Sequence, residues 1–353
     1  MYKLNSIIEN QKINELLSDF KRSPHQLNKP HESDAEIIKL NDGLLAITTD
    51  SISEEILTGL YDDPYIIGWM IVTINISDIA AVGALPIGIL ISEIIPQDFG
   101  QEKIRELQKG ISDACIMYKT FLLGGDTNEG ESLVLTGTAI GIIQNKKIMS
   151  RLGCKSGDIL YSSGKLGDGN AYAISKLISE TNSFTKYKPL ARIKEGRTIS
   201  KYASCCMDTS DGLIATLDQL MRLNNAGFEL NNNWQNVIDD DAIEYSKNLN
   251  LPPWILFAGQ HGEFELIFTI PTEFKNAFLK ETLKNELSPI ELGRVISDRE
   301  VKIPLYKELI SINTAFIRNL PIEANGDINH YLKMLLEYDY QIKHEPSLKF
   351  TSP

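Results

Sequence analysis

The chain has 353 residues, of which 42% are hydrophobic and 23% charged, with 47 acidic against 35 basic side chains. This composition is typical of a globular protein long enough for two ordinary domains. The net charge of −12 argues against a nucleic-acid partner, because affinity for a phosphate backbone comes mainly from lysine and arginine. Plain solubility or metal-binding carboxylates both explain the excess of acids.

Four cysteines, none at CxxC spacing, are expected to be reduced thiols of a cytoplasmic protein: Cys115, Cys154, Cys205 and Cys206. The N-terminal residues lack the apolar core of a signal peptide. No segment has the roughly 20 apolar residues of a membrane helix, since the longest runs are interrupted by Asn75, Asp78 and Glu93. We therefore expect no membrane partner.

Apolar residues at helical spacing predict a helix over residues 5–20. The turn signal Asn41-Asp42-Gly43 separates predicted strands over 35–40 and 44–50. Residues 62–84 have the pattern of a helix, with Asp62 or Asp63 as its cap, Pro64 in its first turn and Gly83 at its end. A strand over 86–95, a helix over 102–118 and strands over 121–125 and 133–143 follow. This order predicts an α/β domain whose sheet is not purely parallel.

The polar turn at 151–158 predicts a boundary between an N-terminal domain, 1–150, and a C-terminal domain, 151–353. Residues 159–178 have the pattern of a strand, a glycine loop and a helix. A helix over 213–223 and a strand over 264–270 follow, so the second domain is also α/β. We expect the polar tail after Tyr338 to be loosely ordered.

Aspartates recur where predicted strands and helices end or begin. Asp50 ends "LAITTD", Asp126 lies in "LLGGDTNEG", and Asp78 lies in "NISD"; Asp208 and Asp211 lie in "MDTSDG", and Asp34 precedes the strand "AEIIKL". Magnesium prefers hard oxygen ligands and is often bound by a few carboxylates together with substrate phosphates. Neighbouring hydroxyl groups and glycines add neutral oxygens and close backbone approach: Thr48, Thr49, Thr127 and Ser210, with Gly124, Gly125 and Gly212. The set favours a metal–nucleotide site.

Other interpretations of these residues remain open at this level. Asp208 and Asp211 would also serve as caps of the following helix. Asp78 and Asn75 share one helix face, which suits either a polar site or a buried hydrogen bond. "GKLGDGNA" around Lys165 lacks the full phosphate-loop pattern and favours a simple strand-to-helix turn. His261 is either a general base or a polar loop residue.

Five motifs occur in order: "TTD", "NISDIAAVGALP", "GGDTNEG", "SRLGCKSGDILYSSGKLGD" and "MDTSDGL". The series, from about residue 32 to 331, resembles the AIR synthase-like superfamily, and within it the thiamine-monophosphate kinase family. The resemblance implies a two-domain α/β fold with mixed sheets packed against helices. It also implies a homodimer with the N-terminal sheet at its interface, and ATP bound with several magnesium ions.

Carried over by position, the resemblance assigns metal ligation to aspartates and assisting threonines: Asp34, Thr48, Thr49, Asp50, Asp78, Asp126, Asp208 and Asp211. It assigns ATP contacts to Gly125, Asp126, Arg151 and Ser210, and catalytic roles to Asp126, Asp211 and Arg151. The implied reaction transfers the γ-phosphoryl group of ATP to thiamine phosphate or a related small acceptor. In such a site catalysis is positioning and charge neutralisation. The alternatives are a cyclo-ligase or dehydratase of the superfamily, and a non-catalytic nucleotide-binding dimer.

The departures from the family pattern lie mostly where the acceptor would be held. The family's "GDD" is Glu32-Ser33-Asp34 here, and Leu57 stands in place of a histidine that contacts thiamine phosphate. The family's "GGEDYEL" segment is "GQHGEFEL" here, which introduces His261. The position of the family's substrate-facing glutamate falls on Gly262 or, with a shift, on Glu263. Gln108 replaces a tyrosine near the nucleotide. These changes predict a retained ATP–magnesium site with an altered pocket for a phosphate or carboxylate acceptor.

Overall fold

The computed structural model describes residues 3–18, 20–41, 43–144, 148–178, 184, 187–325 and 327–344. The chain divides into two compact units. The N-terminal unit comprises residues 23–150 and 188–201, and the C-terminal unit comprises residues 1–22, 151–187 and 202–353. The division after residue 150 falls where the sequence places it. The segments 1–22 and 188–201 are the differences, because each packs with the unit opposite to its predicted domain.

The N-terminal unit is built on a five-stranded mixed sheet in the order β1-β2-β5-β3-β4. Only the β3–β4 pair is parallel among these neighbours, and the others are antiparallel. This mixture is the one that the order of predicted elements implied. The strands are β1 (Glu36–Leu40), β2 (Gly43–Ser51), β3 (Leu85–Pro96), β4 (Leu122–Gly130) and β5 (Val134–Ile143).

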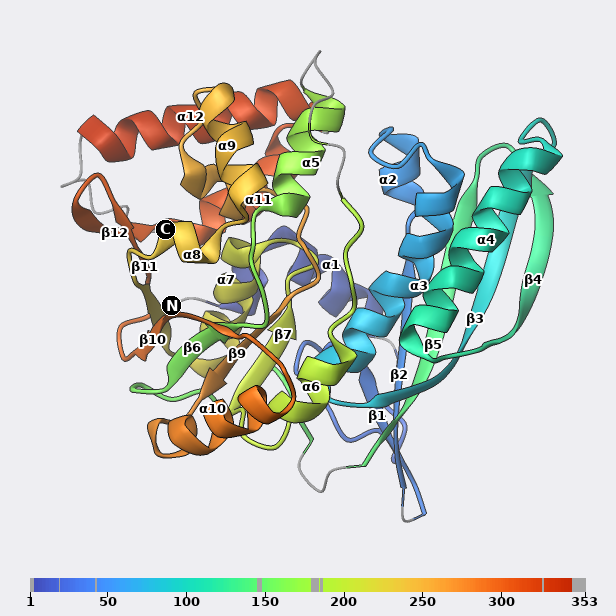
Figure 1. Cartoon of the computed structure of the whole chain (residues 1–353), viewed down its shortest axis with the longest axis horizontal. Coiled ribbons are helices and arrows are strands. Elements are labelled where there is room, and N and C mark those ends of the chain that lie inside the picture. Colours follow the sequence, from blue (N-terminus) through green and yellow to red (C-terminus); the bar gives the residue numbers. More distant parts are fainter. Residues whose placement is uncertain are drawn as a thin grey trace. The chain divides into compact units, whose positions relative to one another are not determined.

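Two long helices, α3 (Pro64–Ala81) and α4 (Gln101–Tyr118), cover one face of this sheet (Figure 1). The Asp63 side chain caps α3 by accepting a hydrogen bond from the Tyr65 N–H at 2.8 Å, as the sequence indicated. The two helices pack at glycines: a Cβ on Gly68 or on Gly110 would lie 2.0 Å from a backbone oxygen of the other helix. Most of α3 is buried. It is long and apolar enough to span a membrane by composition, but it is a core helix of this unit.

A strap from the later chain completes the helical layer of the N-terminal unit. Lys188 places its Nζ 3.7 Å from the Trp69 ring centroid on α3 and donates to the Tyr65 hydroxyl at 2.9 Å. The following helix α6 (Ile193–Ile199) lies so close to α3 that a Cβ on Gly196 would be 2.1 Å from the Ala80 carbonyl. These contacts explain why residues 188–201 belong to this unit.

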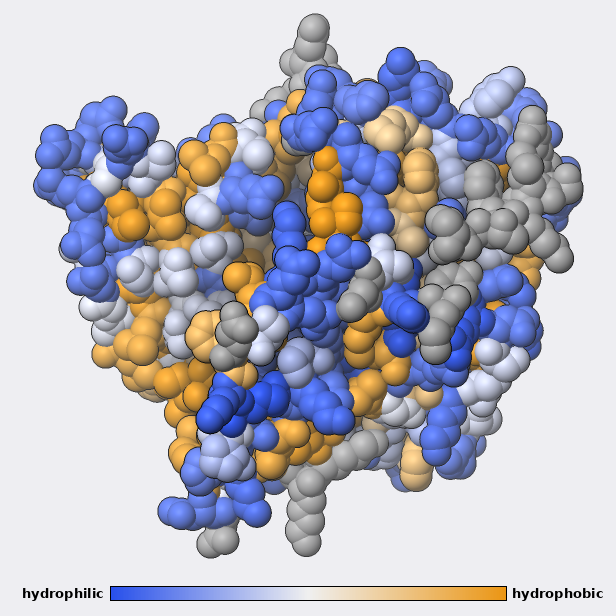
Figure 2. Space-filling model, turned by 180° about the vertical axis from the view of Figure 1, so that it is seen from behind, coloured by the Kyte–Doolittle hydropathy of each residue, from blue (hydrophilic) through white to orange (hydrophobic). Residues whose placement is uncertain are grey.

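The opposite face of the sheet is exposed and apolar. In β3 the buried residues alternate with exposed ones, so Leu90 and Ile94 point away from α3 and α4. Ile142 of β5 and Leu123 of the edge strand β4 are also exposed. Figure 2, seen from behind the view of Figure 1, shows apolar side chains gathered on this half of the molecule. We call this surface the outer face of the sheet, defined by Leu90, Ile94, Leu123 and Ile142.

The C-terminal unit contains a seven-stranded sheet in the order β12-β11-β8-β10-β6-β9-β7, in which the β11–β8 pair is parallel. Its strands are β6 (Ile159–Ser162), β7 (Cys205–Asp208), β8 (Gly227–Leu230), β9 (Leu266–Ile270), β10 (Ile290–Ile296), β11 (Val301–Leu305) and β12 (Glu308–Ile312). Its longer helices are α1 (Ile8–Leu17), α5 (Asp168–Leu177), α7 (Leu213–Asn224), α9 (Asp240–Asn248), α10 (Lys275–Lys284), α11 (Thr314–Glu323) and α12 (Ile328–His344). Short turns of helix are α2 (Ser53–Leu57, in the N-terminal unit), α8 (Trp234–Val237), η1 (Leu4–Ser6), η2 (Pro253–Phe257) and η3 (Thr272–Phe274).

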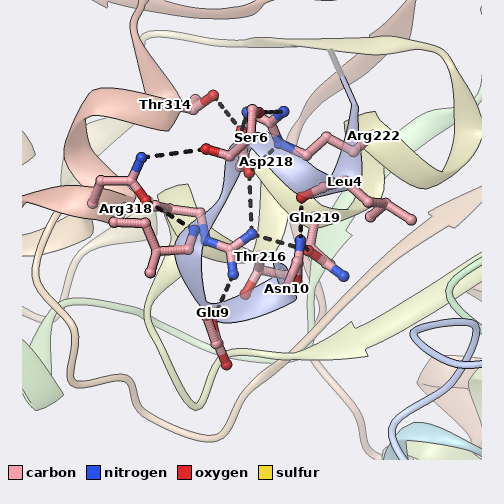
Figure 3. Close-up of polar contacts among 12 residues, drawn as sticks. Leu4, Ser6, Glu9, Asn10, Thr216, Asp218, Gln219, Arg222, Thr314 and Arg318 are labelled. Carbon is pink, nitrogen blue, oxygen red and sulfur yellow. Dashed lines mark hydrogen bonds and ion pairs between the residues drawn. The ribbon is translucent and has the colours of Figure 1, made fainter. Parts of the chain in front are cut away.

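The first residues of the chain are tied to α7 and α11 by a network of charged groups (Figure 3). Asp218 of α7 is fully buried and accepts hydrogen bonds from Arg222 at 2.7 and 2.8 Å and from Arg318 at 3.1 Å. Arg222 also donates to the Lys3 carbonyl at 2.9 Å, and Arg318 reaches Glu9 at 2.9 Å. The predicted helix over 5–20 corresponds to α1. The hydrogen bonds from Arg222 and Arg318 attach this N-terminal segment to the C-terminal unit.

The prediction of a loose tail after Tyr338 is wrong for residues 339–344. Helix α12 continues to His344, and Asp339 accepts hydrogen bonds from the Trp254 Nε1–H at 2.6 Å and the Tyr306 hydroxyl at 2.5 Å. Ile342 is buried one turn later. The prediction failed because it rested on the polar composition of the tail, whereas the hydrogen-bond partners of Asp339 are residues remote in sequence. Residues 345–353 lie outside the described part of the chain.

Candidate active site

Two predicted ligands, Asp34 and Asp78, come together in the N-terminal unit. One carboxylate oxygen of each lies within 4.8 Å of the other, which is a spacing that a single cation can bridge. Thr48 Oγ1 of β2 donates to Asp78 Oδ2 at 2.5 Å. The donor set is entirely oxygen, so its chemistry fits magnesium rather than a soft transition metal.

Strand β2 presents its predicted residues on alternating faces. Thr48 pairs with Ala139 and Asp50 with Gly137, and both partners lie on the face covered by α3. Asp50 is exposed near the end of the strand. Asp50 therefore lies on the same face of the sheet as Thr48, whose hydroxyl group donates to Asp78.

Asp126 lies on the other face of the same sheet. Its register partner is Ser92, which alternates with the buried Ile91 and Glu93 and so shares the outer face with Leu90. Asp126 Oδ2 accepts a hydrogen bond from Asn128 Nδ2 at 2.7 Å. Three strand spacings separate β4 from β2 in this sheet, which is about 14 Å. Asp126 thus lies on the face of the sheet opposite to α3, the helix that carries Asp78.

Two further predicted residues of this sheet have local structural roles. Gly125 faces Ile91, and a Cβ there would lie 1.8 Å from the Ile91 carbonyl oxygen, so close strand pairing alone requires the glycine. Thr49 donates to the Gly137 carbonyl at 2.8 Å and contacts the Thr138 hydroxyl at 3.1 Å across the β2–β5 pair. Neither contact involves the Asp34–Asp78 group.

The remaining predicted residues belong to the C-terminal unit. Asp208 is buried at the end of β7, and Ser210 and Asp211 follow in the turn before α7. The N-cap residue of α7 is Gly212, so the alternative in which an aspartate occupies the cap position is wrong. The Ser210 carbonyl accepts from the Gly262 N–H at 2.9 Å, which joins "DTSDG" to the "GQHGEFEL" segment. Arg151 is the first residue of the segment 151–187 of this unit, and its carbonyl accepts a hydrogen bond from Asn224 Nδ2 at 2.8 Å.

The altered "GDD" segment leaves one acid for a cation. Glu32 Oε2 accepts from the Lys29 N–H at 2.7 Å, and Ser33 Oγ donates to the Ala35 carbonyl at 2.8 Å. Both side chains thus stabilise the turn that precedes β1. Asp34 is the residue of the three that reaches Asp78.

Gln108 has a partner that the sequence did not indicate. Gln108 lies on α4, and its Nε2 donates to both carboxylate oxygens of Glu93 on β3, at 2.8 and 3.0 Å. Burial raises the pKa of Glu93, and the hydrogen bond from Gln108 opposes that rise. The residue in the tyrosine's place is therefore used to satisfy a buried carboxyl group.

Residues 261–266 of the "GQHGEFEL" segment are buried. His261 packs against the rings of Tyr187 and Tyr172, with centroid separations of 5.1 and 6.4 Å. Burial lowers the pKa of His261 to about 4, so the imidazole is neutral near pH 7. Burial also raises the pKa of Glu263 to about 8, although its Oε1 accepts from the Gly167 N–H at 2.6 Å and the Gly169 N–H at 3.3 Å.

Glu263 has an acidic neighbourhood that sequence reasoning missed. Asp168, the first residue of α5, has its pKa raised to about 7 by burial and then by the charges of Asp239, Asp241 and Glu265. Its position in "GKLGDGNA" gave a signal only for a turn, and that turn is confirmed between β6 and α5. Lys165 pairs with Asp240 at 3.0 Å. Leu57, in the place of the family's histidine, is an exposed residue at the end of α2.

Comparison with known proteins identifies the family of the chain. Residues 32–143 match the model of the AIR synthase related protein, N-terminal domain. Thiamine-monophosphate kinase from Methanocaldococcus jannaschii is 31% identical over 322 residues, which are 82% of this chain and 94% of that protein. The enzyme of the same name from Pyrococcus horikoshii is 32% identical over 247 residues, 68% of this chain and 77% of that protein.

Solved structures give the same result. AaThiL complexed with AMPPCP and TMP is 26% identical, with a TM-score of 0.69 over 82% of this chain and 90% of that one. The thiamine monophosphate kinase from Aquifex aeolicus is 25% identical, with a TM-score of 0.65 over 85% of this chain and 97% of that one. The hydrogenase maturation protein HypE in complex with HypF, 16% identical with a TM-score of 0.69, shares the fold. The chain belongs to the thiamine-monophosphate kinase family, within the AIR synthase-like fold.

Proposed function

We propose that this protein is an ATP-dependent kinase that transfers the γ-phosphoryl group of ATP to thiamine monophosphate. The observation that carries the proposal is the Asp34–Asp78 pair with the Thr48 hydroxyl, an all-oxygen cation site in a chain of this family. A relative was solved with AMPPCP and TMP together. We place the protein in the cytoplasm, where its four buried, free cysteines stay reduced.

Magnesium, when bound, would neutralise the phosphate oxygens as charge develops during transfer. Asp34 and Asp78 are the proposed first ligands, and Asp50 shares their face of the sheet. The Thr48 hydroxyl fixes the orientation of Asp78 by donating to Oδ2. We further propose Asp208 and Asp211 as cation ligands, Ser210 as an ATP contact and Arg151 as the group that offsets phosphate charge; these four rest on the family resemblance.

We propose a homodimer formed through the outer face of the sheet. Leu90, Ile94, Leu123 and Ile142 expose an apolar surface there, and such a surface on a soluble enzyme marks an interface. Asp126 lies on this face, away from Asp78 of its own chain. A second copy packed on the outer face would bring Asp126 to the partner's nucleotide, which gives this aspartate its proposed role in both cation binding and catalysis.

The acceptor is tested directly by ADP release. Purified protein with ATP and Mg²⁺ is supplied with thiamine monophosphate, thiamine, or a panel of small phosphates and carboxylates. We expect ADP in proportion to thiamine monophosphate consumed, with thiamine diphosphate as product. ADP only with another acceptor would overturn the substrate assignment, and tight ATP binding without ADP from any acceptor would show a non-catalytic nucleotide-binding dimer.

Mixing two inactive variants tests the role of Asp126. Asp78→Asn and Asp126→Asn proteins are combined and allowed to exchange subunits, then assayed for ADP release. If Asp126 acts on the partner's site, mixed dimers contain one intact site, and about one quarter of wild-type activity returns. Activity that stays at the level of the separate variants, although exchange is confirmed by mass-tagged subunits, would place both aspartates in one chain's site.

A further inference from the structure

Asn75 is a fully buried polar residue on α3, one turn before Asp78. Its Oδ1 accepts a hydrogen bond from the Asp50 N–H at 3.1 Å, and its Nδ2 lies 3.5 Å from the Asp50 carbonyl. Nδ2 also donates to the Ile71 carbonyl at 2.9 Å, which fixes the amide on its own helix. The side chain therefore contacts both backbone groups of Asp50 from a rigid support.

The end of β2 needs such support. β1 pairs with β2 only as far as Ile47, whereas β5 continues to pair with it through Ser51. Residues 48–51 are thus held by a neighbouring strand on one side only. A strand end with one partner frays more readily than a paired one, and Asp50 lies in this stretch.

Gly137 provides the space for the Asn75 amide. It is the register partner of Asp50 on β5, and a Cβ at this position would lie 2.4 Å from Asn75 Nδ2. Real Cβ atoms do not approach so closely, so alanine at 137 would displace the amide. Three elements, α3, β2 and β5, therefore meet at one hydrogen-bonded point.

We propose that Asn75 is a positioning residue: it holds the backbone of Asp50 so that the Asp50 carboxylate stays on the same side of the sheet as Asp34 and Asp78 and completes their cation site. This inference rests on the proposed function, since it assigns Asp50 to the cation. Groups that orient metal ligands typically change metal affinity by about 10- to 100-fold when removed. A role in packing alone would change stability and leave metal affinity intact.

The test uses two ways of removing the clamp and one matched control. Asn75→Leu keeps the approximate shape of the side chain and removes both contacts with Asp50. Gly137→Ala leaves Asn75 itself unchanged and displaces its amide group by steric contact with the added methyl group. Gly141→Ala is the control, because a Cβ there would meet Ile79 and Ala84 at 2.8 and 3.1 Å on the same helix-covered face, away from Asn75.

Mn²⁺ serves as the probe, and its binding is followed by electron paramagnetic resonance of the free ion, with and without ATP. Thermal unfolding and the Mg²⁺ concentration for half-maximal ADP release are measured in parallel. We expect Asn75→Leu and Gly137→Ala to weaken Mn²⁺ binding about 10-fold or more and to raise the Mg²⁺ requirement. Gly141→Ala should lose thermal stability and keep both metal values.

Wild-type Mn²⁺ affinity in a stable Gly137→Ala protein would overturn the inference and leave the proposed kinase function standing. The same conclusion follows if Gly137→Ala and Gly141→Ala weaken Mn²⁺ binding equally. A wild-type protein that binds neither Mn²⁺ nor ATP would remove the proposed function together with the inference. Gly137→Ala keeps the test decisive if Asn75→Leu fails to fold.

Discussion

Two groups of carboxylates in this protein contrast in how their charge is balanced. In the C-terminal unit, Asp218 lies between Arg222 and Arg318, and Arg318 also pairs with Glu9 (Figure 3). In the N-terminal unit, Asp34 lies beside Asp78, a second acid, with the Thr48 hydroxyl on the latter. The first group contains two acids and two permanent cations. The second brings like charges together.

The difference indicates which group serves stability and which serves function. A buried carboxylate bracketed by guanidinium groups is satisfied by the chain itself, so its loss leaves charges uncompensated within the fold. Two carboxylates within 4.8 Å repel each other unless a cation lies between them. The two groups should therefore respond in opposite ways to the removal of one acid.

The largest effect is expected from Asp78→Asn. The amide keeps the shape of the side chain and removes one proposed cation ligand, so ADP release should fall at least about 100-fold. The free energy of unfolding should stay within about 1 kcal/mol of wild type, because like-charge repulsion with Asp34 is relieved. Turnover and urea denaturation measure the two quantities. Wild-type turnover in this variant would refute the cation site.

Asp218→Asn should show the reverse pattern. Two arginines lose their buried counter-charge, which destabilises a protein by about 3–5 kcal/mol. ADP release per folded molecule should remain within about threefold of wild type, because no proposed ligand is altered. Asp298→Asn, at an exposed pair with Lys302, is the control and should cost less than about 1 kcal/mol. Equal losses of stability in Asp218→Asn and Asp298→Asn would contradict the stabilising role assigned to the buried Asp218.

Glu263→Gln tests a third kind of buried acid, one held by backbone N–H groups. Burial raises the Glu263 pKa from its ordinary 4.5 to about 8, so folding favours the neutral form. Its contribution to stability is complete below about pH 4.5 and is lost as the pH rises through about 8. Gln keeps the acceptor for Gly167 and should raise the stability at pH 9 by about 1–3 kcal/mol. Denaturation curves at pH 5 and pH 9 measure this. No gain at pH 9 would show that Glu263 ionises freely.

The smallest effect on the folded chain is expected from Leu123→Glu on the outer face of the sheet. An exposed leucine made acidic should leave the unfolding of the monomer nearly unchanged. It should weaken the proposed dimer, and sedimentation velocity at micromolar concentration should show monomers. Leu283→Glu, at an exposed leucine of α10, is the matched control and should leave the dimer intact. A dimer that survives Leu123→Glu would place the interface elsewhere.

The sequence by itself determined the local elements and the kinds of chemistry available. Asp63 as the N-cap residue and Pro64 in the first turn predicted the start of α3, and the order of strands and helices predicted a mixed sheet. Aspartates at element ends predicted oxygen-based cation binding, and in the N-terminal unit two of them, Asp34 and Asp78, have carboxylate oxygens within 4.8 Å of each other. These features depend on neighbours in the chain, where hydrogen bonding and alternation of apolar residues act over a few positions.

The tertiary structure decided what depends on contacts between distant residues. Only strand register and the packing of α3 show that Asp126 lies on the face of the sheet opposite to the helix that carries Asp78. Only packing shows that residues 1–22 belong with α7 and α11, since Arg222 and Arg318 bind them across more than 200 positions of sequence. A side chain's face and partner are set by the pairing of remote segments, and that information is absent from any local pattern.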